Sequence, residues 1–148
     1  MSKSDTCENN LLKLIFNNTN WANVGDATGL RGASTAGNFY IALYTADPGE
    51  AGSAVTNETA YTNYARQAVA RASGAGGFTV TNNSVSPYSN IDFPACGATP
   101  GGAITHWGIV TTASGAGELL YSGAVSPNIT MATGVIPRVL STSTITED

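Results

Sequence analysis

The sequence predicts a mainly β protein: an antiparallel β-sandwich or jelly roll of about eight short strands with one short N-terminal helix. Large apolar side chains alternate with Tyr40, Ala42 and Tyr44 along residues 38–45, which is the period of two that a sheet imposes. Clusters of Gly, Asn, Pro and Ser recur at short intervals and predict turns. Charged residues make up only 11% of the 148 residues and hydrophobic residues 42%, so a rigid fold is favoured over disorder. We expect a single domain over residues 1–148.

A helix is expected over residues 5–17. Asp5 followed three residues later by Glu8 resembles a capping box, and Asn17-Asn18 is a reasonable end. The apolar face of this helix docks either on the sheet of its own chain or on a neighbouring subunit. Its residues recur at helical spacing and are Cys7, Leu11, Leu14 and Ile15, with Leu12 and Phe16 beside them.

Residues 18–37 form an irregular segment rich in Gly, Asn and Thr, with Trp21, Val24 and Leu30 as candidate anchors. Strands dominate residues 38–146, and the first is followed by an Asp-Pro-Gly turn at residues 47–49. The expected strands cover residues 38–45, 64–71, 77–81, 89–93, 103–111, 117–123, 127–132 and 135–146.

Two of these strands carry more specific expectations. In the strand at 103–111, Trp107 and Ile109 are assigned to the side that faces the core. The segment at 135–146 is β-branched and nearly uncharged, and Pro137 confines its start to a sheet edge or a bulge. An exposed edge of this kind aggregates unless it is covered, and in an assembly a partner strand could cover it.

No catalytic, cofactor-binding or metal site is expected. His106 is the only histidine, and no serine lies in a Gly-x-Ser-x-Gly turn, so a nucleophile would lack its base. Cys7 and Cys96 are expected to be reduced thiols, and with one histidine they cannot form a closed zinc site. The acidic residues between 47 and 58 could contribute oxygens to a calcium ion, but a solvated acidic turn is the simpler interpretation.

The charge balance argues against nucleic acid as a partner, and the hydropathy pattern argues against a membrane. Acidic residues number 10 and basic residues 6, giving a net charge of -4. No apolar run is long enough to span a bilayer, and the first residues lack the apolar core of a signal peptide. The basic residues form no cluster that would bind phosphates; they are Lys3, Lys13, Arg31, Arg66, Arg71 and Arg138.

Several segments carry a resemblance to a known family. A strand and small-residue loop at 39–53 precede Tyr64-Ala65-Arg66-Gln67-Ala68-Val69, and Asn90–Pro94, Ile104–Ile109 and Glu118–Ala124 follow in order. Together they resemble a family of small tailed-bacteriophage virion proteins, described as tail-fibre-like, minor tail or capsid decoration proteins. The resemblance spans residues 39–124 and implies a structural role in the virion without enzyme activity. Residues 17–38 and 54–63 depart from the family pattern.

The function favoured by this resemblance is capsid decoration. A cement protein would bind the major capsid protein in the assembled head and stabilise the particle by mass action. Copies would form a homo-oligomer, for which a trimer is one arrangement, and would assemble into the virion in the cytoplasm of the bacterial host. The alternatives are a tail-associated structural protein that binds other tail proteins at a fibre base, adaptor or baseplate, and a carbohydrate-binding module on the virion surface.

Tyrosine is enriched at interfaces because it combines an apolar ring with a polar tip. The alternative interpretation of the tyrosines in this chain is that they are half-buried sheet residues. The candidate assembly interface comprises Leu11, Tyr40, Tyr44, Tyr61 and Tyr64.

Overall fold

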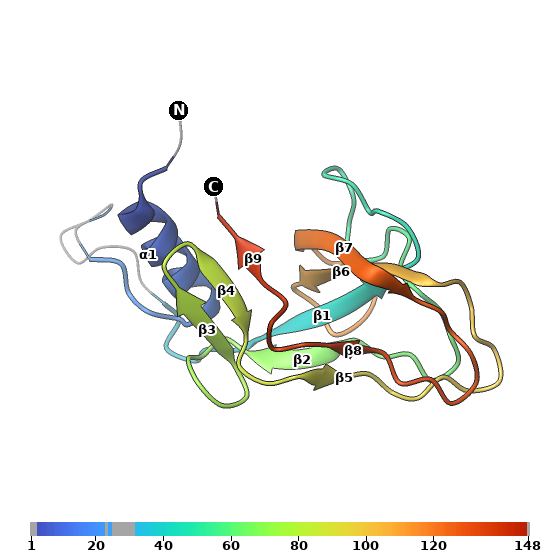
Figure 1. Ribbon diagram of the computed structural model, residues 1–148. Helices are drawn as coiled ribbons and strands as arrows, with labels where there is room; N and C mark the ends of the chain where they lie inside the picture. The colour runs from blue at the N-terminus through green and yellow to red at the C-terminus, as the bar shows by residue number, and fades with distance from the viewer. Residues whose placement is uncertain (1–2, 23, 25–31, 148) are drawn as a thin grey trace. The chain divides into compact units, whose positions relative to one another are not determined.

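The computed structural model describes residues 3–22, 24 and 32–147 (Figure 1). It confirms a mainly β protein with antiparallel sheets and one short helix; within the described residues there are nine strands. Trp21 and Val24 are partly buried, whereas the third candidate anchor, Leu30, lies outside the described residues. The elements are α1 (Asp5–Phe16), β1 (Asn38–Tyr44), β2 (Gln67–Ala70), β3 (Phe78–Thr81), β4 (Ser84–Pro87), β5 (Ile91–Asp92), β6 (Ile104–Val110), β7 (Leu119–Ile129), β8 (Arg138–Val139) and β9 (Ile145–Thr146).

Contacts divide the chain into two compact units, each built from separate segments. The strands form a sheet in the order β2-β1-β6-β7, a sheet in the order β3-β4-β9, and the pair β5-β8. The single domain over residues 1–148 stays a prediction. The first unit comprises Met1–Asn38, Val69–Ile91 and Leu140–Asp148, and the second comprises Phe39–Ala68 and Asp92–Val139.

In the first unit, α1 begins at Asp5 as expected, but its N-cap lies one residue earlier than expected. Ser4 is the N-cap: its backbone is extended, and its hydroxyl accepts a hydrogen bond from the Cys7 amide at 3.3 Å. The expectation that Asp5 caps the helix is therefore wrong, because Asp5 already lies in the first turn, where its negative charge favours the helix dipole. The helix ends at Phe16, within one residue of the expected end.

The buried stripe of α1 consists of Glu8, Leu12 and Phe16, which follow one another at intervals of four. The expected face, centred on Leu11, is displaced by one position, and Leu11 is only partly buried. The displacement follows from tertiary packing: the Phe16 ring meets Phe78 of β3 edge-on at 5.0 Å, and α1 packs against β3 and β4 (Figure 1). The helix therefore docks on a sheet of its own chain.

Arg71 holds the C-terminal end of α1. Its guanidinium donates to the carbonyl oxygens of Ile15 at 2.8 Å and Leu14 at 3.1 Å, which have no partner within the helix. It also donates to the Ala36 carbonyl at 3.2 Å. A cation at this end is favoured by the helix dipole, so Arg71 both caps the helix and ties it to the chain that leads into β1.

The turn expected at Asn82-Asn83 is present and joins β3 to β4, with Asn82 at a positive φ of 54°. Strand β4, Ser84–Pro87, was not among the expected strands, because Ser and Pro are poor strand formers. Pairing overrides this local preference. The inner residue Val85 is 1% exposed and lies opposite Val80 of β3 and Ile145 of β9.

In the second unit, β1 and β6 pair in an unbroken register from Tyr40 opposite Val110 to Tyr44 opposite His106. Both interior strands are buried on both faces over part of their length, at 41–44 and at 108–110. Ile109 is fully buried as expected, but Trp107 is only partly buried. Because Gly108 and Val110 on the opposite face are also buried, the expectation that only one face of this strand points to the core is wrong.

The strands after β6 also differ from the expectation. The two strands expected at 117–123 and 127–132 are one long strand, β7, whose pairing with β6 shifts register between Ile104 and His106. The segment expected as one strand at 135–146 contains two separate short strands, β8 and β9. Pro137 before β8 is buried, and its carbonyl accepts from the Phe93 amide at 2.9 Å.

Leu12→Ala tests the corrected face of α1. Leu12 is fully buried, so removing its side chain should lower the free energy of unfolding by about 2–5 kcal/mol, the usual range for a core leucine. The matched control is Leu11→Ala, which should cost much less because Leu11 is only partly buried. Urea denaturation followed by circular dichroism measures both, and a larger loss for Leu11→Ala would restore the face expected from the sequence.

Candidate functional site

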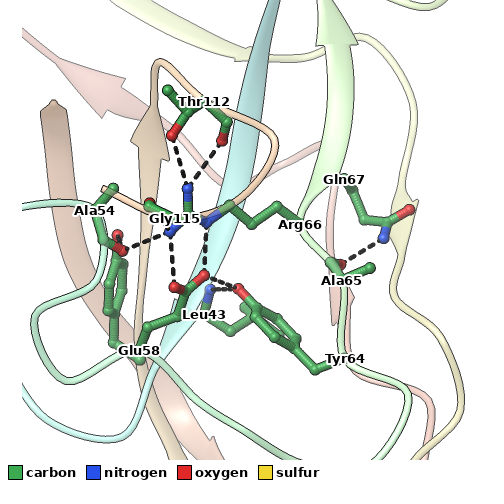
Figure 2. A network of polar contacts seen from close by, with 10 residues as sticks. Leu43, Ala54, Glu58, Tyr64, Ala65, Arg66, Gln67, Thr112 and Gly115 are labelled. Carbon is green, nitrogen blue, oxygen red and sulfur yellow. Dashed lines mark hydrogen bonds and ion pairs between the residues drawn. The ribbon is translucent and has the colours of Figure 1, made fainter. Parts of the chain in front are cut away.

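A buried charged cluster organises the loops at one end of the second unit (Figure 2). Arg66 follows the loop after β1, and its side chain is only 2% exposed. Its Nε and Nη2 atoms donate to the two carboxylate oxygens of Glu58, at 2.6 and 2.7 Å. This two-pronged geometry is specific to arginine, because its planar fork matches a carboxylate.

The other donors of Arg66 reach backbone oxygens from two further segments. Nη1 donates to the carbonyl and the hydroxyl of Thr112, at 2.9 and 3.0 Å. Nη2 also lies within hydrogen-bond distance of the carbonyls of Ala54, at 3.2 Å, and Gly115, at 3.0 Å (Figure 2). All the N–H groups of the guanidinium therefore face acceptors, and one side chain joins the loop before it to the turn after β6.

Tyr64 extends this cluster toward β1. Its hydroxyl donates to Glu58 at 2.9 Å and accepts from the Leu43 amide at 3.1 Å. Its ring stacks on Phe93 at 6.2 Å and meets Tyr61 edge-on at 5.4 Å. The carboxylate of Glu58 is therefore held from two sides, by a cation and by a phenol, and the aromatic rings shield the phenol from water.

Burial shifts the ionisation of the tyrosines in this region. Burial raises the pKa of Tyr44 and of Tyr61 from 10.0 to about 12. Burial also raises the pKa of Tyr64, further than for the other two, and the nearby charge of Glu58 acts in the same direction. The hydrogen bond to Glu58 raises the pKa of Arg66. The tyrosines are therefore neutral hydrogen-bonding groups across the physiological pH range.

The five residues of the candidate assembly interface differ in exposure, and they do not all lie in the same unit. Tyr44 and Tyr61 are 0% and 2% exposed, and the Tyr44 hydroxyl lies 3.4 Å from the Ala54 carbonyl. Tyr40 and Tyr64 are partly buried, and Tyr40 packs against the core cluster that includes Tyr44. Leu11 lies in the other unit. Tyr44, Tyr61 and Tyr64 thus gather inside the second unit, and the role of the five residues in assembly stays a prediction.

The Arg66–Glu58 pair was not expected from the sequence. Glu58 was expected to be one of the acidic residues of a solvated turn, whereas its carboxylate accepts from Arg66. Asp47, from the same group, accepts from the Gly49 amide at 2.9 Å and stabilises its own turn. Among the described residues, no group of three or more His, Cys, Asp or Glu side chains could hold a metal ion. An available signal was an arginine inside the apolar Tyr64–Val69 stretch of a chain poor in charge, because such a residue needs a buried partner.

A groove of about 610 Å³ lies beside β7 in the same unit. It is lined by six consecutive residues of β7, Leu119–Ala124, by His106 of β6, and by Asp47, Gly49 and Glu50 of the turn after β1. His106 Nδ1 lies 2.9 Å from the hydroxyl of Thr105. The groove is therefore an open surface feature with two carboxylates at its rim and no charged residue on the strand itself.

Arg66→Ala tests the buried cluster. Removing the guanidinium leaves the Glu58 carboxylate, only 15% exposed, without its counter-charge, so the free energy of unfolding should fall by about 3–5 kcal/mol. The matched control is Arg138→Ala, which breaks an exposed ion pair with Asp92 and should change stability little. Urea denaturation measures both, and equal losses would show that Arg66 contributes no more than a surface pair.

The buried tyrosines predict a loss of stability in alkali. Because their folded-state pKa values are raised above 10.0, the unfolded chain loses its phenolic protons first. Their contribution is fully present below about pH 10 and should be lost as the pH rises toward about 12. Urea denaturation at a series of pH values measures this, and Tyr44→Phe should make the fall shallower. An unchanged slope in that variant would remove Tyr44 from the explanation.

Comparison with known proteins agrees with the resemblance found in the sequence. The family described as Podophage GP4 fiber I protein gp80 matches residues 2–146. No curated protein matches the chain. In the described part of the chain, no helix has the length and apolar character needed to cross a membrane. Since the match extends over nearly the whole sequence, the chain belongs to the Podophage GP4 fiber I protein gp80 family, and the expected kinship with tailed-phage virion structural proteins is confirmed.

Proposed function

We propose that this chain is a non-enzymatic, tail-associated structural protein of a bacteriophage virion, and that it forms part of a fibre or its attachment. The observation that carries the proposal is the match to a phage fibre family over residues 2–146. The family's description names a fibre protein, which favours the tail-associated alternative over capsid decoration.

The structure supports a scaffolding role through its internal bonding. In the second unit, Arg66 fixes the loop around Glu58 and the turn around Thr112 by hydrogen bonds to backbone and side-chain oxygens. In the first unit, Arg71 fixes the end of α1 in the same way. A rigid β-rich fold with few charged residues suits a component that works against protein neighbours, because burying unpaired charges at an interface is costly.

The proposed partners are other tail proteins and further copies of the same chain. Capsid decoration would instead require binding to the major capsid protein, and a carbohydrate-binding module would require binding to a glycan by the isolated protein. These roles differ in how many copies a particle carries and in what is lost when the protein is removed, so they can be separated by experiment.

The copy number per virion tests the proposal. Quantitative mass spectrometry of purified particles should give a ratio of a few per cent to the major capsid protein, because a tail offers few positions. The control is a tail-tube or portal protein of the same particles, whose copies should fall in the same range. Removal of the gene should abolish adsorption and leave heads stable. A ratio near one or one-third, with unstable heads on removal, would instead establish decoration.

A further inference from the structure

A second groove, of about 500 Å³, lies between α1 and β3 in the first unit. This volume falls in the range of small-molecule binding sites. All but one of the described residues that line it are polar, and they include one acidic and one basic side chain. The lining residues are Asp5, Thr6, Asn9 and Lys13 of α1, and Val80, Thr81 and Asn82 of β3 and the turn that follows it.

The outer edge of β3 supplies backbone groups to this groove. Phe78 donates its amide to the carbonyl of Ala72, which precedes β3, at 2.8 Å, so the amide of Phe78 points away from the neighbouring strand β4. Successive residues of an antiparallel strand direct their amide and carbonyl groups to opposite edges. Val80 and Asn82 therefore direct these groups to the same outer edge as Phe78.

One position of this outer edge remains open. The amide of Phe78 is paired with Ala72, and the Asn82 carbonyl accepts from the side-chain amide of Asn9 at 2.6 Å. Between them, the amide and carbonyl of Val80 have no hydrogen-bond partner among the described residues. A single open position is too short for an added strand, because strands usually extend over at least about three residues.

The groups that line the groove include both donors and acceptors. Val80 offers an amide and a carbonyl oxygen, the Lys13 ammonium only donates, and the Asp5 carboxylate only accepts. The hydroxyl of Thr81 can do either. A ligand hydroxyl also donates and accepts, so a ligand with several hydroxyls can satisfy all of these groups together.

The two charges at the groove favour a neutral ligand. Asp5 and Lys13 belong to the same helix, and a separation of eight residues corresponds to about 12 Å along its axis. Neither forms an ion pair with another described residue. An anion would be attracted by Lys13 and repelled by Asp5, and the reverse holds for a cation.

We propose that this groove binds a neutral saccharide, whose hydroxyls bond to the open peptide groups of Val80 and to the side chains of Asp5, Lys13 and Thr81. No aromatic side chain is among the described residues that line the groove, so ring stacking adds nothing. A single sugar should therefore bind weakly, with a dissociation constant on the order of 1 mM.

The site adds a ligand to the proposed tail-associated role and does not replace that role. Sugar binding is measured on the isolated chain without a virion, whereas the tail-associated role is tested by copy number. A failure of either proposal is therefore distinguishable from a failure of the other. A free sugar and a sugar within a longer glycan share the chemistry that the groove recognises.

Two-dimensional NMR of the isotope-labelled full chain tests the proposal, with glucose, galactose, mannose and N-acetylglucosamine as probes. At least one sugar should shift the backbone amide signals of Val80, Thr81 and Asn82 in a saturable way. NaCl should leave the dissociation constant unchanged, because the ligand is neutral. The linear trisaccharide of the same sugar distinguishes the two sources: tighter binding than the single sugar indicates a glycan chain, and equal binding indicates a free sugar.

Two variants test the contacts. Thr81→Val removes a hydroxyl from the groove and Asp5→Asn removes a charge, and each should raise the dissociation constant at least about fivefold. Thr79→Val is the matched control: Thr79 is an exposed residue of the same strand and is not among the residues that line the groove, so the constant should not change. Valine favours strands, so both threonine variants should fold, and circular dichroism checks this.

Several results would overturn the proposal. The first is the absence of a saturable shift at Val80, Thr81 and Asn82 with every one of the four sugars. The second is an equal loss of binding in Thr79→Val and Thr81→Val. The third is displacement of the sugar by inorganic phosphate, which would assign the groove to anions. The last is tighter binding of trialanine than of any sugar, which would assign the groove to an extended peptide.

Discussion

The two-pronged contact between Arg66 and Glu58 fixes the part of the second unit where its loops meet its sheet. Glu58 is placed by its backbone, because its neighbours pair with the end of β1: the Thr59 amide donates to the Leu43 carbonyl, and the Thr45 amide donates to the Asn57 carbonyl, each at 2.9 Å. Its carboxylate then meets the guanidinium of Arg66. The loop thereby serves as an additional short strand along β1, and Arg66 locks it in place.

A buried ion pair of this kind does more to specify one arrangement of the fold than to raise its stability. Removing both charges from water is costly, and the cost is offset only when the remaining donors and acceptors are satisfied. Arg66 meets this condition through the oxygens of Ala54, Thr112 and Gly115. Any movement of the loop or of the turn after β6 would leave a buried charge without partners. The cluster therefore specifies one arrangement of these segments.

Local sequence signals predicted those helices and strands whose position does not depend on residues far away in the sequence. The alternation at 38–45 gave β1, the apolar segment at 103–111 gave β6, and helical spacing gave α1 to within one residue. Elements decided by distant partners were missed or misplaced. Strand β4 depends on Ile145, more than fifty residues away, and the buried face of α1 depends on Phe78.

The candidate site shows the same limit more sharply. Nothing adjacent to Arg66 in the sequence indicates that its donors reach Thr112 and Gly115, because those residues arrive through the turn after β6. The tyrosines were identified as important, but periodicity alone could not show that Tyr44 is fully buried in a strand covered on both faces. Local pattern gives the elements, and the partners of a polar side chain come only from the assembled sheet.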